Sequence, residues 1–350
     1  MDRVDFTGVR KIIIRSTNWV GDAVLTTPAV RAIRENFPEA RIALLAKPWV
    51  APVFHNNPHL DKILVYESEG RHRGWLGKAR LVRELRRQRF QLAVLFQNAF
   101  EAAFLVYMAG VPIRIGYDSD CRGALLTRRI PVDQDRVGSH HIEYYLGILQ
   151  GASLRPGDRK LTLELSDIER ARAEEILKEN QISPSRPLVV INPGATFGSS
   201  KRWPLERYAA LGDRIRAAWG AQIVILGGPG ERTVGRQISA LMNRGCINLC
   251  GRTSLREAAA LIEKCELFVT NDSGLMHVAA AFDIPLIAIF GSTDPAATGP
   301  TNPRSRIVQV PASCSPCLKR ECPEDHRCMN EISVDQVYEA VENVLRGDID

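Results

Sequence analysis

The fold is decided by a strand-to-helix unit that reads LFVTNDSGLMHVAA over residues 267–280. Its first part, Leu267–Thr270, is apolar or β-branched along its whole length, which predicts a strand buried on both faces of a parallel sheet. The apolar stretch Leu275–Ala281 has the composition of a buried helix, and Gly274 stands just before it. A buried strand that passes directly into a helix is the repeating unit of a doubly wound α/β sheet.

Units of the same kind recur through both halves of the chain. Helical patterns such as 78–88 and 205–218 alternate with short apolar strand candidates. The expected strands are 11–15, 41–45, 63–65, 92–96, 113–115, 188–192, 222–226, 247–249, 267–270 and 286–290. Each half therefore holds enough strands for a sheet of its own, and we expect an α/β protein with two doubly wound, Rossmann-like domains that face a cleft.

The domain boundary is expected in a polar stretch with several prolines, residues 154–187. Such a composition suits an interdomain linker, and a chain of 350 residues exceeds the ~250–300 residues that a single core usually reaches. We place an N-terminal domain at 1–160 and a C-terminal domain at 161–333. The amphipathic C-terminal helix, 334–350, is expected to pack back on the N-terminal domain.

The overall composition, 45% hydrophobic and 25% charged, is that of an ordinary globular protein. No apolar run approaches the ~20 residues that span a bilayer, and no signal peptide is recognisable, so we expect a cytoplasmic protein whose cysteines are mostly reduced. The net charge of +6 favours anionic partners without implying nucleic acid. The basic segment 71–89 is either a solvated helix face or a patch for peripheral contact with the inner face of the cytoplasmic membrane.

The opening unit also predicts an anion site. Ser273 and Gly274 stand at a helix N-terminus, where free N–H groups and the helix dipole attract negative charge. His277 lies one turn further on and could reach a phosphate, whereas Asp272 is better suited to sugar hydroxyls. The alternative is a capped helix with an interior histidine.

Two more loops follow strands of the second half. Asn192 to Trp203 is rich in glycine and hydroxyl groups and contains Lys201, which suits a diphosphate. The loop Gly227 to Glu231 is as compatible with a structural turn as with a nucleotide turn, in which Glu231 would accept hydrogen bonds from a ribose.

Asp22 follows the first strand of the chain, in the run Ser16 to Asp22. It could cap the next helix, a role that aspartate fills well. It could equally serve as a general base, which requires a carboxylate within reach of a hydroxyl.

A cysteine-rich segment near the C-terminus contains Cys314, Cys317, Cys322, His326 and Cys328. Thiolates and imidazole at such spacings are compatible with zinc, while a reduced loop without metal fits equally well.

These motifs together resemble the bacterial lipopolysaccharide heptosyltransferases, most closely the type that adds the second heptose. The resemblance covers nearly the whole chain. It depends on Asn18 to Asp22, Thr26 to Ala29, Asn192 to Ala195, Lys201 to Pro204, Asp272 to Gly274 with His277, and the cysteine-rich segment.

The resemblance implies an inverting glycosyltransferase of the GT-B type that needs no metal or other cofactor. The donor would be ADP-L-glycero-D-manno-heptose, and the acceptor the first heptose of a lipid-linked inner core. It implies that Asp22 is the base. The implied donor-binding residues are Thr196 and Lys201 for the phosphates, Glu231 for the ribose, Thr253 for the adenine side, and Asp272, Ser273, Gly274 and His277 for phosphate and sugar.

Three other functions remain open at this point. The chain could add the first heptose or act as a related core transferase. It could be a nucleotide-sugar epimerase, because such enzymes can share the two-domain architecture. A nucleotide-binding module without activity is the third option, and a carboxylate such as Asp22 on the other domain argues against it.

Overall fold

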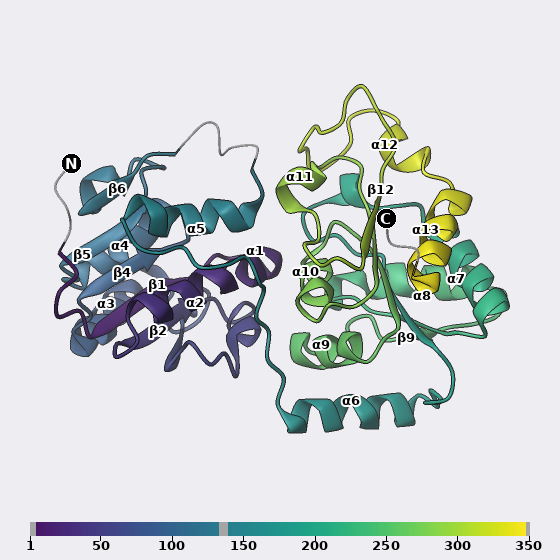
Figure 1. Ribbon diagram of the computed structural model, residues 1–350, viewed down its shortest axis with the longest axis horizontal. Helices are drawn as coiled ribbons and strands as arrows, with labels where there is room; N and C mark the ends of the chain where they lie inside the picture. Colours follow the sequence, from purple (N-terminus) through teal and green to yellow (C-terminus); the bar gives the residue numbers. More distant parts are fainter. Residues whose placement is uncertain (1–4, 133–138, 348–350) are drawn as a thin grey trace. The chain divides into compact units, whose positions relative to one another are not determined.

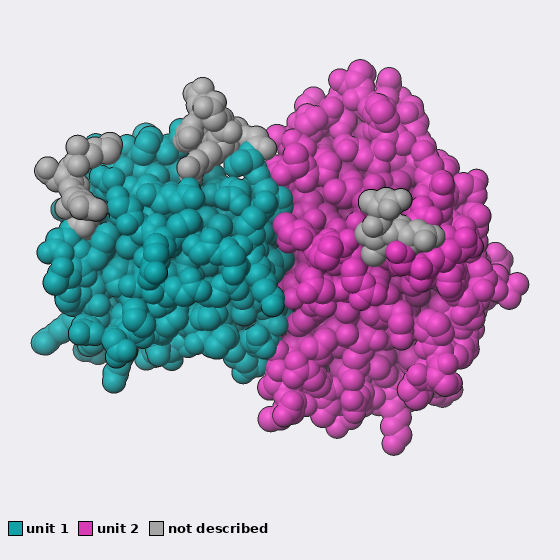
Figure 2. Space-filling view, viewed as in Figure 1, with its two compact units in different colours: residues 1–164 teal, residues 165–350 magenta. Residues whose placement is uncertain are grey.

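The computed structural model describes residues 5–132 and 139–347 (Figure 1). The chain divides into two compact units, Met1–Glu164 and Leu165–Asp350 (Figure 2). This division lies close to the boundary expected after residue 160. None of the helices in the described residues is both long enough and apolar enough to cross a membrane.

The first unit contains a sheet of six parallel strands in the order β3-β2-β1-β4-β5-β6. Helix α3 packs against α4, and α2 against α5, so the sheet lies between helical layers (Figure 1). The strands are β1 (Lys11–Arg15), β2 (Arg41–Ala46), β3 (Lys62–Val65), β4 (Leu92–Leu95), β5 (Ile113–Tyr117) and β6 (Arg128–Ile130). The helices are α1 (Val20–Leu25), α2 (Thr27–Asn36), α3 (Gly74–Gln88), α4 (Phe100–Met108) and α5 (His141–Gly151).

The second unit repeats this topology, with the parallel order β12-β11-β10-β7-β8-β9. The strands are β7 (Leu188–Asn192), β8 (Gln222–Ile225), β9 (Ile247–Asn248), β10 (Leu267–Asn271), β11 (Leu286–Ile289) and β12 (Ser305–Val308). The helices are α6 (Asp167–Glu179), α7 (Leu205–Trp219), α8 (Arg232–Leu241), α9 (Leu255–Glu263), α10 (Gly274–Ala281), α11 (Pro295–Thr298), α12 (Arg327–Asn330) and α13 (Val334–Arg346). Counted from its own first strand, each sheet has the Rossmann order 3-2-1-4-5-6, so the prediction of two doubly wound domains is confirmed.

Local sequence explains where several helices begin. Ser166, Ser254 and Ser333 each accept a hydrogen bond from the backbone N–H three residues on, and the side chain of the Glu or Gln at that position accepts one from the serine N–H. These capping boxes satisfy donors that a helix start would otherwise leave unpaired. In the second sheet, the central strands β7 and β10 are buried at every residue.

The C-terminal helix corrects one prediction. Helix α13 packs on α7, β11 and β12, all of which belong to the second unit (Figure 1). Val337, Val341 and Val344 join the core that α7 and the sheet already form. An amphipathic pattern shows that a helix buries one face, but it does not show which body covers that face.

Two strands were not predicted. Strand β6 reads Arg-Arg-Ile and strand β12 reads Ser-Arg-Ile-Val, and both lie at the end of their sheet. An edge strand has only one neighbour, so it can carry charged, partly exposed residues and lacks a continuous apolar run.

Candidate functional site

The candidate donor site is the carboxyl edge of the second sheet, the edge at which ligands bind in doubly wound domains. Because all six strands are parallel, the loops that follow them meet there. In sheet order the site residues are Thr293 after β11, Asp272 after β10, Gly194 after β7, Glu231 after β8 and Thr253 after β9. The predicted loops of the second half are therefore brought to a single edge.

At the middle of this edge, Lys201 and Asp272 form an ion pair. The Lys201 Nζ lies 2.5 Å from Asp272 Oδ2, and the two side chains are only 13% and 6% exposed. Thr293 donates its hydroxyl to the same carboxylate oxygen over 2.8 Å. The sequence predicts that Asp272 faces sugar hydroxyls, whereas in this structure its Oδ2 forms an ion pair with Lys201. A phosphate that reached Lys201 would therefore compete with a carboxylate already in place.

Helix α10 starts beside this pair. Ser273 is its N-cap: the Ser273 Oγ accepts from the Met276 N–H at 3.3 Å and bonds to Asn192 Oδ1 at 2.9 Å. Gly274 is the first helical residue, and His277 is buried in the first turn. Both parts of the alternative, a cap and an interior histidine, are thus present. They leave further N–H groups of the first turn available to an anion, because one cap satisfies only part of that set.

Two buried asparagines, which sequence reasoning gave no role, fix the loops of this edge. Asn271 donates to the Pro193 carbonyl at 2.8 Å, and its Oδ1 accepts from the Trp203 N–H and from the Tyr208 hydroxyl at 2.7 Å. Asn192 donates to the Leu226 carbonyl at 2.9 Å. The signal that could have found them is an amide at the last position of an otherwise apolar strand.

Glu231 closes its own turn. Its carboxylate accepts from the Gly228 N–H at 2.6 Å, and it lies so close to Gly194 that a Cβ at that glycine would stand 1.5 Å from Glu231 Oε1. Burial raises the pKa of Glu231, while the Gly228 N–H and the charge of Arg202 act in the opposite direction. The structural-turn interpretation is therefore supported, and the ribose contact stays a prediction.

The other predicted donor residues lie on neighbouring loops. Thr253 is half-buried in the turn that precedes the N-cap of α9, and Thr196 is exposed on the loop after β7. Thr196 therefore has the room to meet a ligand.

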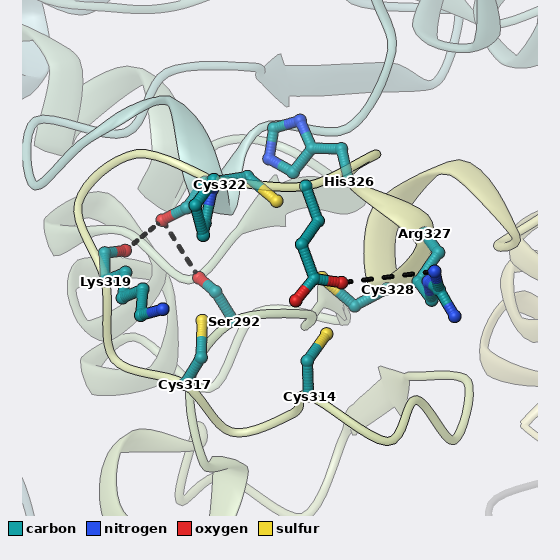
Figure 3. Close-up of a pocket in the computed structure, with 11 residues that line it drawn as sticks. Ser292, Cys314, Cys317, Lys319, Cys322, His326, Arg327 and Cys328 are labelled. Carbon is teal, nitrogen blue, oxygen red and sulfur yellow. Dashed lines mark hydrogen bonds and ion pairs between the residues drawn. The ribbon is translucent and has the colours of Figure 1, made fainter.

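The cysteine-rich loop packs against the loop that carries Lys201 (Figure 3). Ser200 bonds to the Lys319 carbonyl through its side chain, and its N–H donates to the Arg320 carbonyl at 3.2 Å. Ser292 donates to Ser200 Oγ at 3.1 Å and accepts from the Cys317 N–H at its carbonyl. The segment between β12 and α12 thus helps to hold the Lys201 loop in place.

The four cysteines of this loop surround a cavity of about 20 Å³ (Figure 3). Burial, together with the neighbouring thiols, raises the pKa of Cys328 to about 11. Within residues 5–132 and 139–347, no group of three or more His, Cys, Asp or Glu side chains is arranged so that it could hold a metal ion. The zinc alternative at Cys314, Cys317, Cys322 and Cys328 therefore gains no support from their geometry.

Asp22 belongs to the first unit and is not an N-cap. The N-cap of α1 is Trp19, which makes no side-chain cap bond, and Asp22 lies within the first turn. Its Oδ1 lies 3.5 Å from Nδ1 of His141, the first residue of α5. The Asp22 side chain is 28% exposed, so it is accessible to a substrate. The capping alternative is thus wrong, and an accessible carboxylate on the loop and helix that follow β1 meets one requirement of a general base.

Buried cations line the carboxyl edge of the first sheet, and sequence reasoning missed them. Arg15, Lys47 and Arg122 are each at most 8% exposed. Arg122 donates to the carbonyls of Gln97 and, at 2.9 Å, of Tyr117. Gln97 and the further acceptor Asn98 Oδ1 lie 25 and 24 residues before Arg122 in the sequence, so no local pattern marks this arginine as buried.

Residues 78–327 match the family glycosyltransferase family 9 (heptosyltransferase). Lipopolysaccharide heptosyltransferase 2 of Salmonella typhimurium is 30% identical, over 96% of this chain and 98% of that protein. The structure of Escherichia coli ADP-heptose lipopolysaccharide heptosyltransferase II aligns with a TM-score of 0.81 at 28% identity, covering 97% and 99% of the two chains. A family 9 glycosyl transferase from Veillonella parvula, at 24% identity, shares the fold with a TM-score of 0.90 over 99% of this chain and all of that one.

Proposed function

The chain belongs to glycosyltransferase family 9, the heptosyltransferases, and we propose that it adds the second heptose of the lipopolysaccharide inner core. It would transfer L-glycero-D-manno-heptose from ADP-heptose to the first heptose, with inversion at the anomeric carbon. The observation that carries the proposal is the Lys201–Asp272 pair beside the start of α10. The lysine and the N–H groups of the helix start can both bind phosphate, and they lie at the carboxyl edge of a Rossmann sheet.

The second unit would hold the donor. Lys201 would exchange its carboxylate partner for a donor phosphate, since ammonium groups bind phosphate and carboxylate oxygens alike. The released Asp272 could then accept hydrogen bonds from the sugar. The remaining contacts would come from Thr196, Ser273, Gly274 and His277 toward phosphate, Glu231 toward ribose and Thr253 toward adenine.

The first unit would supply the base. Asp22 would take the proton from the acceptor hydroxyl as the new oxygen–C1 bond forms and the bond from C1 to the phosphate oxygen breaks. A single displacement of this kind inverts C1. The negative charge that develops on ADP would be stabilised by Lys201 and the N-terminus of α10, so the reaction needs no metal or cofactor.

We place the protein in the cytoplasm, in peripheral contact with the inner membrane through segment 71–89. Helix α3 in this segment buries only Gly77, Leu81 and Leu85 and leaves its arginines toward solvent. Trp75 and Leu76 are 82% and 88% exposed, an apolar pair beside these cations. Anionic lipid attracts such segments.

Replacing Arg83 and Arg87 with Gln should weaken sedimentation of the protein with phosphatidylglycerol vesicles, while binding to neutral vesicles stays at background. Unchanged sedimentation would contradict this proposed membrane contact.

The proposed function is tested with purified protein, ADP-heptose and two truncated acceptors, one without heptose and one with a single heptose. We expect one heptose to be added to the second acceptor only. Addition to the heptose-free acceptor would instead identify the enzyme that adds the first heptose. Conversion of the donor with no acceptor present would identify an epimerase.

A further inference from the structure

The pair formed by Asp22 and His141 joins two elements that are distant in sequence. Asp22 is on α1 and His141 opens α5, and these helices pack against each other. The distance of 3.5 Å between Asp22 Oδ1 and His141 Nδ1 is at the upper limit of a hydrogen bond. Within the described residues, Nδ1 is a buried atom with no hydrogen-bond partner, although the histidine side chain as a whole is 42% exposed. The imidazole thus directs its buried edge at the carboxylate.

Aromatic rings pack around Tyr145, which lies close to this pair. Tyr145, one turn further along α5, is 6% exposed, and its ring stacks edge-to-face on Phe96 and Tyr144. Burial raises the pKa of Tyr145 well above its ordinary value, and the negative charge of Asp22 adds to the effect. Tyr145 therefore stays neutral beside Asp22.

We propose that His141 is a positioning residue for Asp22. In this arrangement the imidazole donates its Nδ1–H to Asp22 Oδ1, which leaves Oδ2 to receive the acceptor proton. The proposal rests on the proposed role of Asp22 as the base. A nucleophile–base pair is commonly completed by a third group that orients the base, because a displacement of about 1 Å can cost a hundredfold in rate.

The test uses three substitutions that separate the two ring nitrogens. The amide nitrogen of His141→Asn falls near the position of Nδ1, that of His141→Gln near Nε2, and His141→Ala removes both. We expect kcat to fall roughly 10- to 100-fold in the Ala and Gln variants, with the KM for ADP-heptose within about twofold of wild type. The Asn variant should keep kcat within about threefold of wild type.

The matched control is Glu143→Gln on the same helix, where Glu143 pairs with Arg159 at 3.0 Å and both side chains are well exposed. Its kcat should equal that of the wild type. A wild-type kcat in His141→Ala, or an equal loss in the Asn and Ala variants, would overturn the positioning role. Near-normal transfer by Asp22→Asn would instead overturn the base assignment, so the two failures can be distinguished.

Discussion

The two sheets have the same strand order, yet the helix that follows the fourth strand begins differently in each. In the first unit, α4 carries Glu101 in its first turn, where the carboxylate bonds to Tyr66 at 2.9 Å and Lys78 at 2.6 Å. In the second unit, α10 begins with Ser273 and Gly274 and has no acid in its first turn. The first unit therefore has a carboxylate within the first turn of this helix, whereas the carboxylate nearest the start of α10 is that of Asp272, which is paired with Lys201.

The cations at the carboxyl edges of the two sheets also differ in whether a ligand could replace their partners. Arg122 is fully buried and donates to main-chain carbonyls and to Asn98 Oδ1. A ligand could not take the place of these internal acceptors without unfolding the loops that carry them. Lys201 is bound to a carboxylate, which a phosphate can replace. The comparison teaches that identical topology does not make two equivalent sites. The exchangeable partner of Lys201 supports the proposal that the second unit binds the donor.

The largest effect is expected from Arg122→Met, which removes a structural cation. It leaves the Gln97 and Tyr117 carbonyls and Asn98 Oδ1 without their donor, so the free energy of unfolding should fall by about 3 kcal/mol or more. Denaturant unfolding measures the loss, with the exposed Arg129→Met as control. ADP affinity should be unchanged; a large loss of ADP binding by folded Arg122→Met would break the contrast between the units.

The next effect is expected from Lys201→Met, which removes the exchangeable cation. A charge-assisted hydrogen bond contributes about 1.5–3 kcal/mol, so the Kd for ADP should rise roughly 10- to 100-fold. Calorimetric titration with ADP measures this, and Lys264→Met, which removes the partner of Glu174 on the same unit, serves as control. ADP binding as tight as that of the wild type would contradict the assignment of the donor site.

The smallest effect is expected from Glu101→Gln, which removes the built-in anion. Burial acts to raise the pKa of Glu101, but the hydrogen bonds from Lys78 and Tyr66 outweigh it, and the net pKa lies below the ordinary value. A lowered pKa contributes stability above the unfolded-state pKa, and this stability is lost as the pH falls through the folded-state value. The carboxylate is 37% exposed and partly screened by water, so we expect a loss of about 1 kcal/mol at pH 7.

This difference between wild type and Glu101→Gln should shrink as the pH falls below the unfolded-state pKa of about 4.3 and through the lower folded-state value, because the wild-type carboxylate then becomes protonated. Urea unfolding at pH 7 and at pH 3.5 measures both values. A difference that grows on acidification would show that the anion does not stabilise the first unit.

The sequence was sufficient for the parts of the fold that depend on continuous apolar runs. Strands such as β7 and β10 are buried at every residue, and their patterns predicted them within a residue. The packing partner of α13 could not be predicted, because its amphipathic pattern fits any apolar surface. The edge strands β6 and β12 lack such a run.

The site divides in the same way. Polar residues after buried strands marked the loops of Lys201, Glu231 and Asp272, since the carboxyl ends of parallel strands share one edge. The pairing of Lys201 with Asp272 spans 71 residues, and the approach of His141 to Asp22 joins two separate helices. The spacing of residues along the sequence does not predict such contacts, so they are visible only in the folded structure.

The central claim is that the first unit supplies the base and the second unit binds the donor. Its most direct test measures heptose transfer and ADP binding together for Asp22→Asn. General-base catalysis contributes about 10²- to 10⁴-fold, so transfer should fall by at least a hundredfold, while the Kd for ADP remains that of the wild type. Transfer at a near-normal rate, or a loss of ADP binding equal to that of Lys201→Met, would contradict the account.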